Sequence, residues 1–182
     1  GQFAVLWKTG QHFASQAQTI LEDSNGSLWI GTKNEGLFHV QGAEVQGYSV
    51  KDGLGHNNVR TLFQDRSGVL WVGTEGGLSR FHQGQWVTFH RKDGLKEEYV
   101  ISLHEDHQGQ LWIGTRSGGL HLWQNGHILH IPVLDMEGKP DSVSCIASEA
   151  NGSLWLGTQS GIRRFRNGQF DSLSRKDGLP FD

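Results

Sequence analysis

The hydrophobic pattern is dominated by one apolar pentapeptide that recurs along the chain. Its first copy is Leu28-Trp29-Ile30-Gly31-Thr32, and its Trp returns as Trp71, Trp112 and Trp155, in steps of 41 to 43 residues. Successive side chains of a strand point to opposite faces, so neither face of this strand is polar. A strand wetted on one side would carry polar residues at every second position. We therefore predict that neighbouring sheets cover both faces.

Each repeat predicts four short strands joined by tight turns. In the second repeat the strands are expected at residues 59–64, 69–74, 78–82 and 85–90, with Gly-containing turns between them. No stretch shows the 3.6-residue periodicity of a helix, so almost no helix is expected. Four strands in a period near 42 residues are typical of a β-propeller. The predicted fold class is all-β: a β-propeller fragment of four four-stranded antiparallel blades plus one orphan outer strand.

The repeat also predicts how the chain is divided. We expect a partial β-propeller over residues 1–182: the outer strand of a preceding blade at 1–8, blades at 17–51, 57–92, 98–134 and 142–176, and a linker to a missing blade at 177–182. Closure as a plain four-bladed ring would leave the first strand surplus. An open arc leaves two apolar blade faces bare, and such faces drive association. Self-association is therefore expected, with two chains completing a larger ring as one form of it.

The composition fits short strands and narrows the partners. The 26 Gly and 3 Pro suit many tight turns, and the 7 Trp and 9 Phe need a buried place. A net charge of −3 with scattered basic residues argues against nucleic acid and against direct membrane contact. A single cysteine, Cys145, excludes an internal disulfide framework. No apolar run approaches the ~18 residues of a membrane span. No secretory signal is present either, which carries little weight in a chain that opens on Gly1.

Several positions together resemble the two-component regulator propeller repeat. Asp65 to Phe81 and Asp93-Gly94-Leu95 match it best, and the resemblance covers essentially the whole chain. It implies a bacterial membrane-anchored sensor with a propeller in its extracytoplasmic, periplasmic part and a histidine kinase or diguanylate cyclase in its cytoplasmic part. It implies no catalytic residues. The linker Asp135-Met136-Glu137-Gly138 departs from the family's Asp-Gly-Leu, so a different local shape is expected there.

The repeated acids and aromatic residues each have a structural interpretation. One acid per repeat opens a tight turn, where a carboxylate accepts backbone N–H groups, so we interpret these acids as turn caps rather than Ca²⁺ ligands. They are Asp23, Asp65, Asp106 and Glu149. The repeat Trp residues are expected in the core, and the Gly two residues after each Trp is expected to leave space for a neighbouring ring. Trp7 and Trp123 keep a sugar-stacking alternative. His104 and His107 have chelating spacing but no companion ligands, so no metal site is predicted.

Any ligand site is expected at one mouth of the central channel. That mouth is built from the linkers between blades and from the turns between second and third strands, and loops of this kind hold variable chemistry. The candidate ligand-binding residues are His56, Asn57, Asn58, Lys96, Glu97, Tyr99, Arg116, Lys139 and Asp141. No catalytic residue and no cofactor is predicted.

The predicted function is therefore non-catalytic ligand recognition in signal transduction. By the resemblance, the ligand is a carbohydrate or another small molecule, and the partners are the remaining propeller blades and sensor domains of a longer chain. Two alternatives stay open. A propeller enzyme, such as a lyase or glycosidase, would need convergent carboxylates or His residues at the channel mouth. A structural protein-interaction module would need no ligand.

Overall fold

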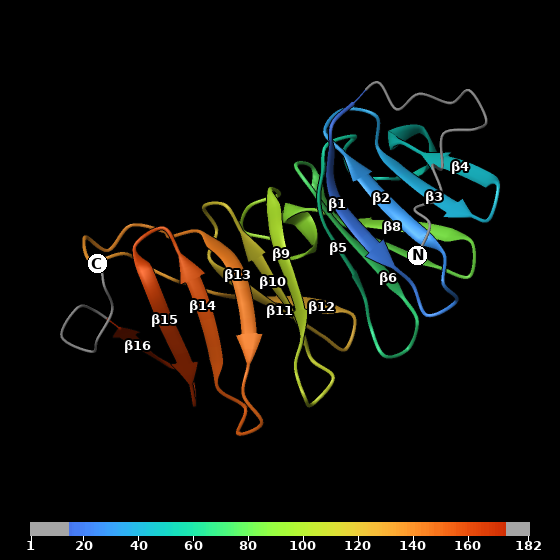
Figure 1. The fold of residues 1–182 in the computed structure, drawn as a ribbon. Helices are drawn as coiled ribbons and strands as arrows, with labels where there is room; N and C mark the ends of the chain where they lie inside the picture. The colour runs from blue at the N-terminus through green and yellow to red at the C-terminus, as the bar shows by residue number, and fades with distance from the viewer. Residues whose placement is uncertain (1–14, 174–182) are drawn as a thin grey trace.

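A computed structural model describes residues 15–173 and shows four antiparallel sheets of four strands each (Figure 1). The first two sheets contain β1 (Ala17–Glu22), β2 (Leu28–Thr32), β3 (Leu37–Gln41), β4 (Glu44–Tyr48), β5 (Val59–Gln64), β6 (Leu70–Thr74), β7 (Gly77–His82) and β8 (Gln85–Phe89). The other two contain β9 (Val100–Glu105), β10 (Leu111–Thr115), β11 (Leu120–Gln124), β12 (His127–Ile131), β13 (Val143–Ser148), β14 (Leu154–Thr158), β15 (Gly161–Arg166) and β16 (Gln169–Leu173). These sheets confirm the all-β propeller prediction. The predicted orphan strand at 1–8 and linker at 177–182 lie outside the described residues.

Helix is confined to two short 3₁₀ turns in the linkers, η1 (Val50–Asp52) and η2 (Arg91–Asp93), among the described residues. This agrees with the lack of helical periodicity in the sequence. Within residues 15–173, no helix has the length and apolar character needed to cross a membrane.

The sheets follow one another in chain order as the blades of a propeller do. Their first strands lie side by side: β1 contacts β5, β5 contacts β9, and β9 contacts β13 (Figure 1). Within each sheet the strands pair in sequence order, so the fourth strand lies farthest from this inner row. The ends of the four first strands therefore share one inner surface, which is where a propeller places its channel.

The core consists of apolar layers between successive sheets. One layer joins Trp29 and Leu37 of the first sheet to Val59 and Val72 of the second, and two equivalent layers join the later sheets. Trp29, Trp71 and Trp112 are 5%, 3% and 6% exposed, as predicted for core positions. Trp155 of the last sheet is only half-buried, with the Arg164 guanidinium 5.6 Å from its ring centroid. The indoles thus fill the space between sheets wherever a following sheet is described.

The Gly of each Trp-x-Gly motif lets a neighbouring strand come close, rather than making room for an aromatic ring. A Cβ placed on Gly73 would lie 2.8 Å from Val100 Cγ1, and one on Gly114 would lie 2.3 Å from the Val143 carbonyl oxygen. Both contacts belong to the first strand of the next sheet. The prediction that this Gly accommodates a neighbouring ring is therefore wrong; it lets the next inner strand approach closely.

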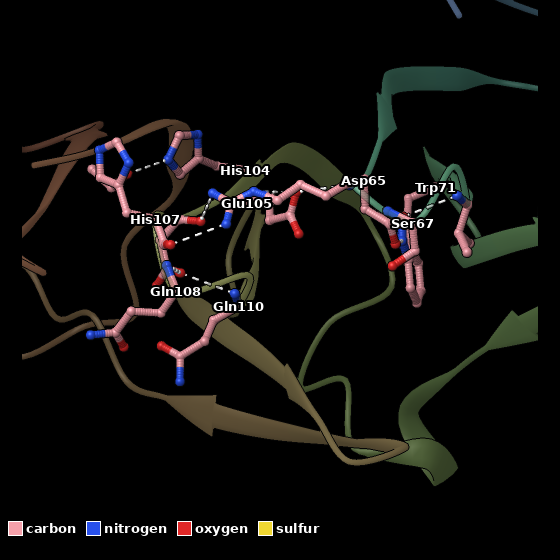
Figure 2. A network of polar contacts seen from close by, with 12 residues as sticks. Asp65, Ser67, Trp71, His104, Glu105, His107, Gln108 and Gln110 are labelled. Carbon is pink, nitrogen blue, oxygen red and sulfur yellow. Dashed lines mark hydrogen bonds and ion pairs between the residues drawn. The ribbon is translucent and has the colours of Figure 1, made fainter. Parts of the chain in front are cut away.

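Three of the four repeated acids cap their turns, as predicted, and also hold the repeat Trp. Asp65 Oδ1 accepts the N–H groups of Ser67 and Val69 at 2.9 and 3.0 Å, while Oδ2 accepts the Trp71 indole N–H at 2.8 Å (Figure 2). Asp23 and Asp106 repeat this arrangement. Burial opposes ionisation of Asp23, but the Trp29 indole and two backbone N–H groups hold its pKa below the usual value.

The fourth sheet divides this task between two residues. Glu149 Oε1 accepts the Trp155 indole N–H at 2.6 Å, and Asn151 Oδ1 accepts the Ser153 N–H at 2.9 Å. The Asn151 amide also donates to Glu149 Oε2 at 2.7 Å. A longer acid therefore still clamps the indole, provided that a neighbouring amide caps the turn.

The same turns tie successive sheets together. The Arg66 N–H donates to Glu105 Oε2 at 3.0 Å, and the Arg66 guanidinium donates to the His107 carbonyl at 3.0 Å. Figure 2 shows this junction, with Glu105 at the end of β9 and His107 in the turn that follows it. This end of the sheets is thus closed by internal bonds, while the linkers lie at the opposite end.

Candidate ligand site at the linker end of the sheets

The first two linkers share one local structure, set by their Asp-Gly-Leu sequence. The Ser49 N–H donates to Asp52 Oδ2 at 2.8 Å, Gly53 takes the left-handed conformation at φ 109°, and Leu54 is buried. The second linker repeats the three steps at Asp93, Gly94 and Leu95. Left-handed backbone favours glycine, so the motif turns the chain and drives the Leu into the core.

Each linker is then anchored on the third strand of the following sheet. The Gly55 N–H donates to Ser79 Oγ at 2.9 Å, and the Lys96 N–H donates to His121 Nε2 at 3.0 Å. His121 is fully buried, and burial together with nearby His130 lowers its pKa from 6.5 to about 4. The neutral imidazole thus acts as a hydrogen-bond acceptor for the linker.

Three of the predicted site residues shape the linkers. His56 Nδ1 accepts the Asn58 N–H at 3.0 Å, and Glu97 Oε1 accepts the Tyr99 N–H at 2.8 Å. Asn57 Oδ1 accepts the Val50 N–H at 3.0 Å. Each of these side chains accepts one backbone N–H of its own linker and so helps to fix the linker's shape.

The third linker has the different shape that its sequence predicts. Asp135 Oδ1 accepts the N–H groups of Glu137 and Lys139, each at 2.8 Å, and closes a tight turn. The Lys139 ammonium pairs with the Glu137 carboxylate at 2.6 Å in solvent. Lys139 therefore belongs to this turn and does not line the pocket described next.

A pocket of ≈ 610 Å³ opens between three sheets at this end of the molecule. It is lined by Arg60, Tyr99, Ile101, Arg116, Ser117, Ser142 and Gln159. These residues come from the starts of the inner strands β5, β9 and β13 and from the turns β10–β11 and β14–β15. The pocket has a mostly polar lining with two guanidinium groups.

Two of the lining residues are placed by β-bulges. The pairing register shifts between Val59 and Thr61 on β5, and again around Ile101 on β9, so Arg60 and Ile101 have no partner across the strand. A bulged residue leaves the regular alternation and its side chain is re-aimed. The bulge therefore puts Arg60 on the inner surface of the sheets rather than between them.

Tyr99 is the centre of the pocket wall. The guanidinium carbons of Arg60 and Arg116 lie over its ring, 5.6 and 5.1 Å from the centroid. Burial and a hydrogen bond with Glu75 raise the pKa of the Tyr99 hydroxyl, although the two arginines act in the opposite direction. The phenol is thus neutral and serves as a platform for two cations.

A chain of hydrogen bonds holds this wall in place across the first three sheets. Arg60 donates to Gln18 Oε1, and the Gln18 amide donates to Asn58 Oδ1 at 2.7 Å. The Asn58 amide in turn donates to Glu75 Oε1 at 2.7 Å. Since Gln18 occupies the bulge of β1, the network links the inner strands of neighbouring sheets.

Asp141 lies directly behind the opposite wall. It is 4% exposed and accepts the N–H groups of Ser142 at 2.8 Å and Gln159 at 3.2 Å. Burial opposes ionisation of Asp141, but bonds from Ser160, Thr158 and Ser142 hold its pKa below the usual value. Asp141 thus fixes two lining residues without lining the pocket itself.

The structure brings together only part of the predicted site. Tyr99 and Arg116 line the pocket, Asn58 and Asp141 support it, and Lys96 is an exposed side chain anchored through its backbone. The other five lining residues are absent from the predicted set: Arg60, Ile101, Ser117, Ser142 and Gln159. Ser117 and Gln159 lie in turns between second and third strands, whereas Arg60, Ile101 and Ser142 lie at the starts of inner strands. The sequence signal for Arg60 is a polar residue directly after the strand-initiating Val59.

Trp123 and His104, two further candidate functional residues of the sequence, contact other side chains of the sheets. Trp123 packs against Trp71, with ring centroids 5.3 Å apart, so a sugar-stacking role for it is not supported; Trp7 lies outside the described residues. His104 Nε2 bonds with Ser148 Oγ at 2.9 Å. In the part of the chain that the structure describes, no three His, Cys, Asp or Glu side chains are arranged so that they could hold a metal ion.

Comparison with known proteins points to one repeat type. A family model described as the two component regulator propeller matches residues 13–34, 53–76 and 94–117. No curated protein sequence matches the chain.

Solved structures share the fold. The extracellular domain of the hybrid two component system BT3049 from B. thetaiotaomicron has 27% identity and a TM-score of 0.71 over 88% of this chain. The corresponding domain of BT4673 has 21% identity and a TM-score of 0.72 over 91%. Virginiamycin B lyase from Staphylococcus aureus has 15% identity and a TM-score of 0.68 over 86%. The chain spans 26% and 23% of the BT4673 and BT3049 domains and 55% of the lyase.

Proposed function

Because the chain carries repeats of the two-component regulator propeller family, we propose that it is a non-catalytic ligand-recognition segment of a bacterial sensor. The pocket between Tyr99, Arg116 and Gln159 binds a small molecule of the carbohydrate class or of similar polarity. Binding changes how this segment packs against the rest of the sensor. A signal requires that the ligand bind two arrangements of the sensor with different affinity.

The observation that carries this proposal is the make-up of the pocket. Its wall combines an aromatic ring, two guanidiniums, two hydroxyls and an amide from three different sheets, which is the mixture that orients a polar ligand. Because each sheet contributes, a ligand that bridges the sheets favours one spacing between them.

The enzyme alternative finds little support at this pocket. Paired acid catalysts need carboxylates free to act on the substrate. Glu75 already accepts the Asn58 amide, and both oxygens of Asp141 accept backbone N–H groups. The likeness to virginiamycin B lyase, at 15% identity, concerns the fold.

Placement and partners follow the same relatives. We propose an extracytoplasmic location, since the BT3049 and BT4673 structures are extracellular domains. We also propose that further propeller blades of a sensor, or a second copy of this chain, cover the open face of the sheet β13–β16.

A thermal-shift screen against mono- and oligosaccharides and small metabolites tests the function, because a ligand that binds the folded state raises Tm. We expect saturable stabilisation by at least one compound, and no product when that mixture is analysed by mass spectrometry. Ser117→Trp, at an exposed lining position, should abolish the shift by filling the pocket.

The matched control is Gln108→Trp, an exposed turn residue at the opposite end of the sheets, which should leave the shift intact. Conversion of a bound compound, or a shift that survives Ser117→Trp, would contradict the proposal.

A further inference from the structure

We propose that the pocket recognises an oxyanion, a carboxylate or sulfate group on a small ligand, through Arg116 and Arg60. This inference rests on the proposed ligand-recognition function and adds the chemical class of the ligand. It starts from two positive charges that the described residues leave without a countercharge.

Arg116 is the clearer of the two. Its side chain is exposed at the β10–β11 turn, and its contact is with the Tyr99 ring at 5.1 Å. Within residues 15–173, neither a hydrogen bond nor an ion pair engages its guanidinium. Five N–H donors therefore face solvent at the edge of the pocket.

Arg60 is nearly as free. Its guanidinium donates to the Gln18 amide oxygen and lies over the Tyr99 ring, and no carboxylate of residues 15–173 pairs with it. Because Arg60 is half-buried, a charge there costs more than at the surface unless something neutralises it. A ligand carboxylate would supply that neutralisation.

Two acids near the pocket, Glu75 and Asp141, accept hydrogen bonds from other groups. Glu75 accepts from the Asn58 amide at 2.7 Å. Asp141 accepts from backbone N–H groups of Ser142, Gln159 and Ser160. Neither carboxylate forms an ion pair with Arg60 or Arg116 within residues 15–173.

The geometry suits an oxyanion rather than another electron-rich group. A guanidinium presents a planar fork of donors that matches a carboxylate or sulfate. The Tyr99 ring holds both guanidiniums in place before a ligand binds, which reduces the conformational entropy lost on binding. Ser117, Ser142 and Gln159 offer further donors for the remaining oxygens.

The test is an amide-resolved NMR titration of the 182-residue chain at constant ionic strength. The probes are sodium sulfate and sodium glucuronate, with glucose as the uncharged match of glucuronate. We expect both anions to shift the amides of Ser117, Ser142 and Gln159 saturably, and glucose to shift them much less. Arg116→Ala should weaken anion binding about tenfold or more, the loss expected for a charge-assisted hydrogen bond.

Arg91→Ala is the control, since Arg91 is an exposed arginine of η2 outside the pocket lining, and it should bind as the unmodified chain does. If glucose and glucuronate shift the pocket amides equally, and Arg116→Ala does not change these shifts, the oxyanion inference is overturned. The proposed ligand-recognition function would then still stand. Absence of pocket shifts with either anion would likewise overturn it and assign the two arginines a structural role on Tyr99.

Discussion

The Asp carboxylate at the head of each of the first three repeat turns performs two tasks with two oxygens. In Asp106, Oδ1 accepts two backbone N–H groups and Oδ2 accepts the Trp112 indole. Because that indole is buried between two sheets, its N–H would otherwise lack a partner. One side chain thereby couples a turn to the core layer.

Asp106→Asn separates the two tasks. The amide keeps one oxygen for the turn but places an NH₂ group against the indole N–H, so the buried donor loses its acceptor. We expect a loss of about 1–3 kcal/mol in the free energy of unfolding, measured by urea denaturation. Asp171→Asn, at an ion pair with Arg164 in which Asp171 is 59% exposed, should cost less than about 1 kcal/mol. Equal stability of the two variants would contradict the indole clamp.

His121 predicts a pH dependence. Its pKa is about 4 in the folded chain and 6.5 unfolded, so the unfolded state binds the proton first as pH falls. Its contribution is therefore fully present above about pH 6.5 and is lost as the pH falls toward about 4. We expect about 2 kcal/mol less stability at pH 5 than at pH 7 from this residue, measured by urea denaturation.

His121→Ser should flatten most of this dependence. Serine is the residue at the equivalent position of the second sheet, where Ser79 Oγ accepts the linker N–H at 2.9 Å. His127→Ser, at an exposed site, should leave the dependence unchanged. A slope that persists in His121→Ser would assign it to other groups.

At the scale of elements, adjacent sheets interlock where a glycine meets the next inner strand. Gly114→Ala places a Cβ 2.3 Å from the Val143 carbonyl oxygen, a backbone atom that cannot rotate away. We expect a loss of about 1–3 kcal/mol or more in unfolding free energy, by urea denaturation.

Gly157→Ala is the matched substitution in the last sheet. Its new Cβ meets Cys145 Sγ at 2.3 Å, the end of an exposed side chain that can change rotamer. It should therefore cost clearly less than Gly114→Ala. If the two cost the same, close approach of the next sheet is not what the glycine provides.

The strands and sheets could be predicted from the sequence, because the repeat period and the pattern of apolar side chains along each strand directly reflect burial. Leu-Trp-x-Gly-Thr is apolar on both faces, and its four copies locate four sheets. The pocket could not be predicted in full, because a bulge breaks the alternation at Arg60 and Ile101. Local sequence shows a polar residue after Val59, but not that an extra residue is inserted there.

At the scale of the molecule, the sheets at the two ends expose residues that the inner sheets bury. Leu37, Leu78 and Leu120 are 0% exposed, whereas Ile162, at the equivalent position of the last sheet, is 37% exposed. In the first sheet, Ile20 is 65% exposed, while Leu62 at its equivalent position is 9% exposed. The exposed face of the last sheet thus matches the kind of apolar surface that the exposed face of a first sheet would cover.

These faces predict head-to-tail association, in which the last sheet of one chain packs on the first sheet of another. We expect the weight-average mass in sedimentation equilibrium to rise with protein concentration. Ile162→Lys and Ile20→Lys should each suppress the rise, because each places a charge in the same heterologous contact. Both positions are exposed in the single chain, so neither variant should unfold it.

Met136→Lys separates this contact from general stickiness. Met136 is 90% exposed, but it lies in the third linker and on neither end face. Its replacement should leave association unchanged if the sheet faces form the contact. A monomer at all concentrations would contradict the prediction. If Ile162→Lys suppresses association but Ile20→Lys does not, the last sheets of two chains pack on each other, because such a contact does not involve the first sheet.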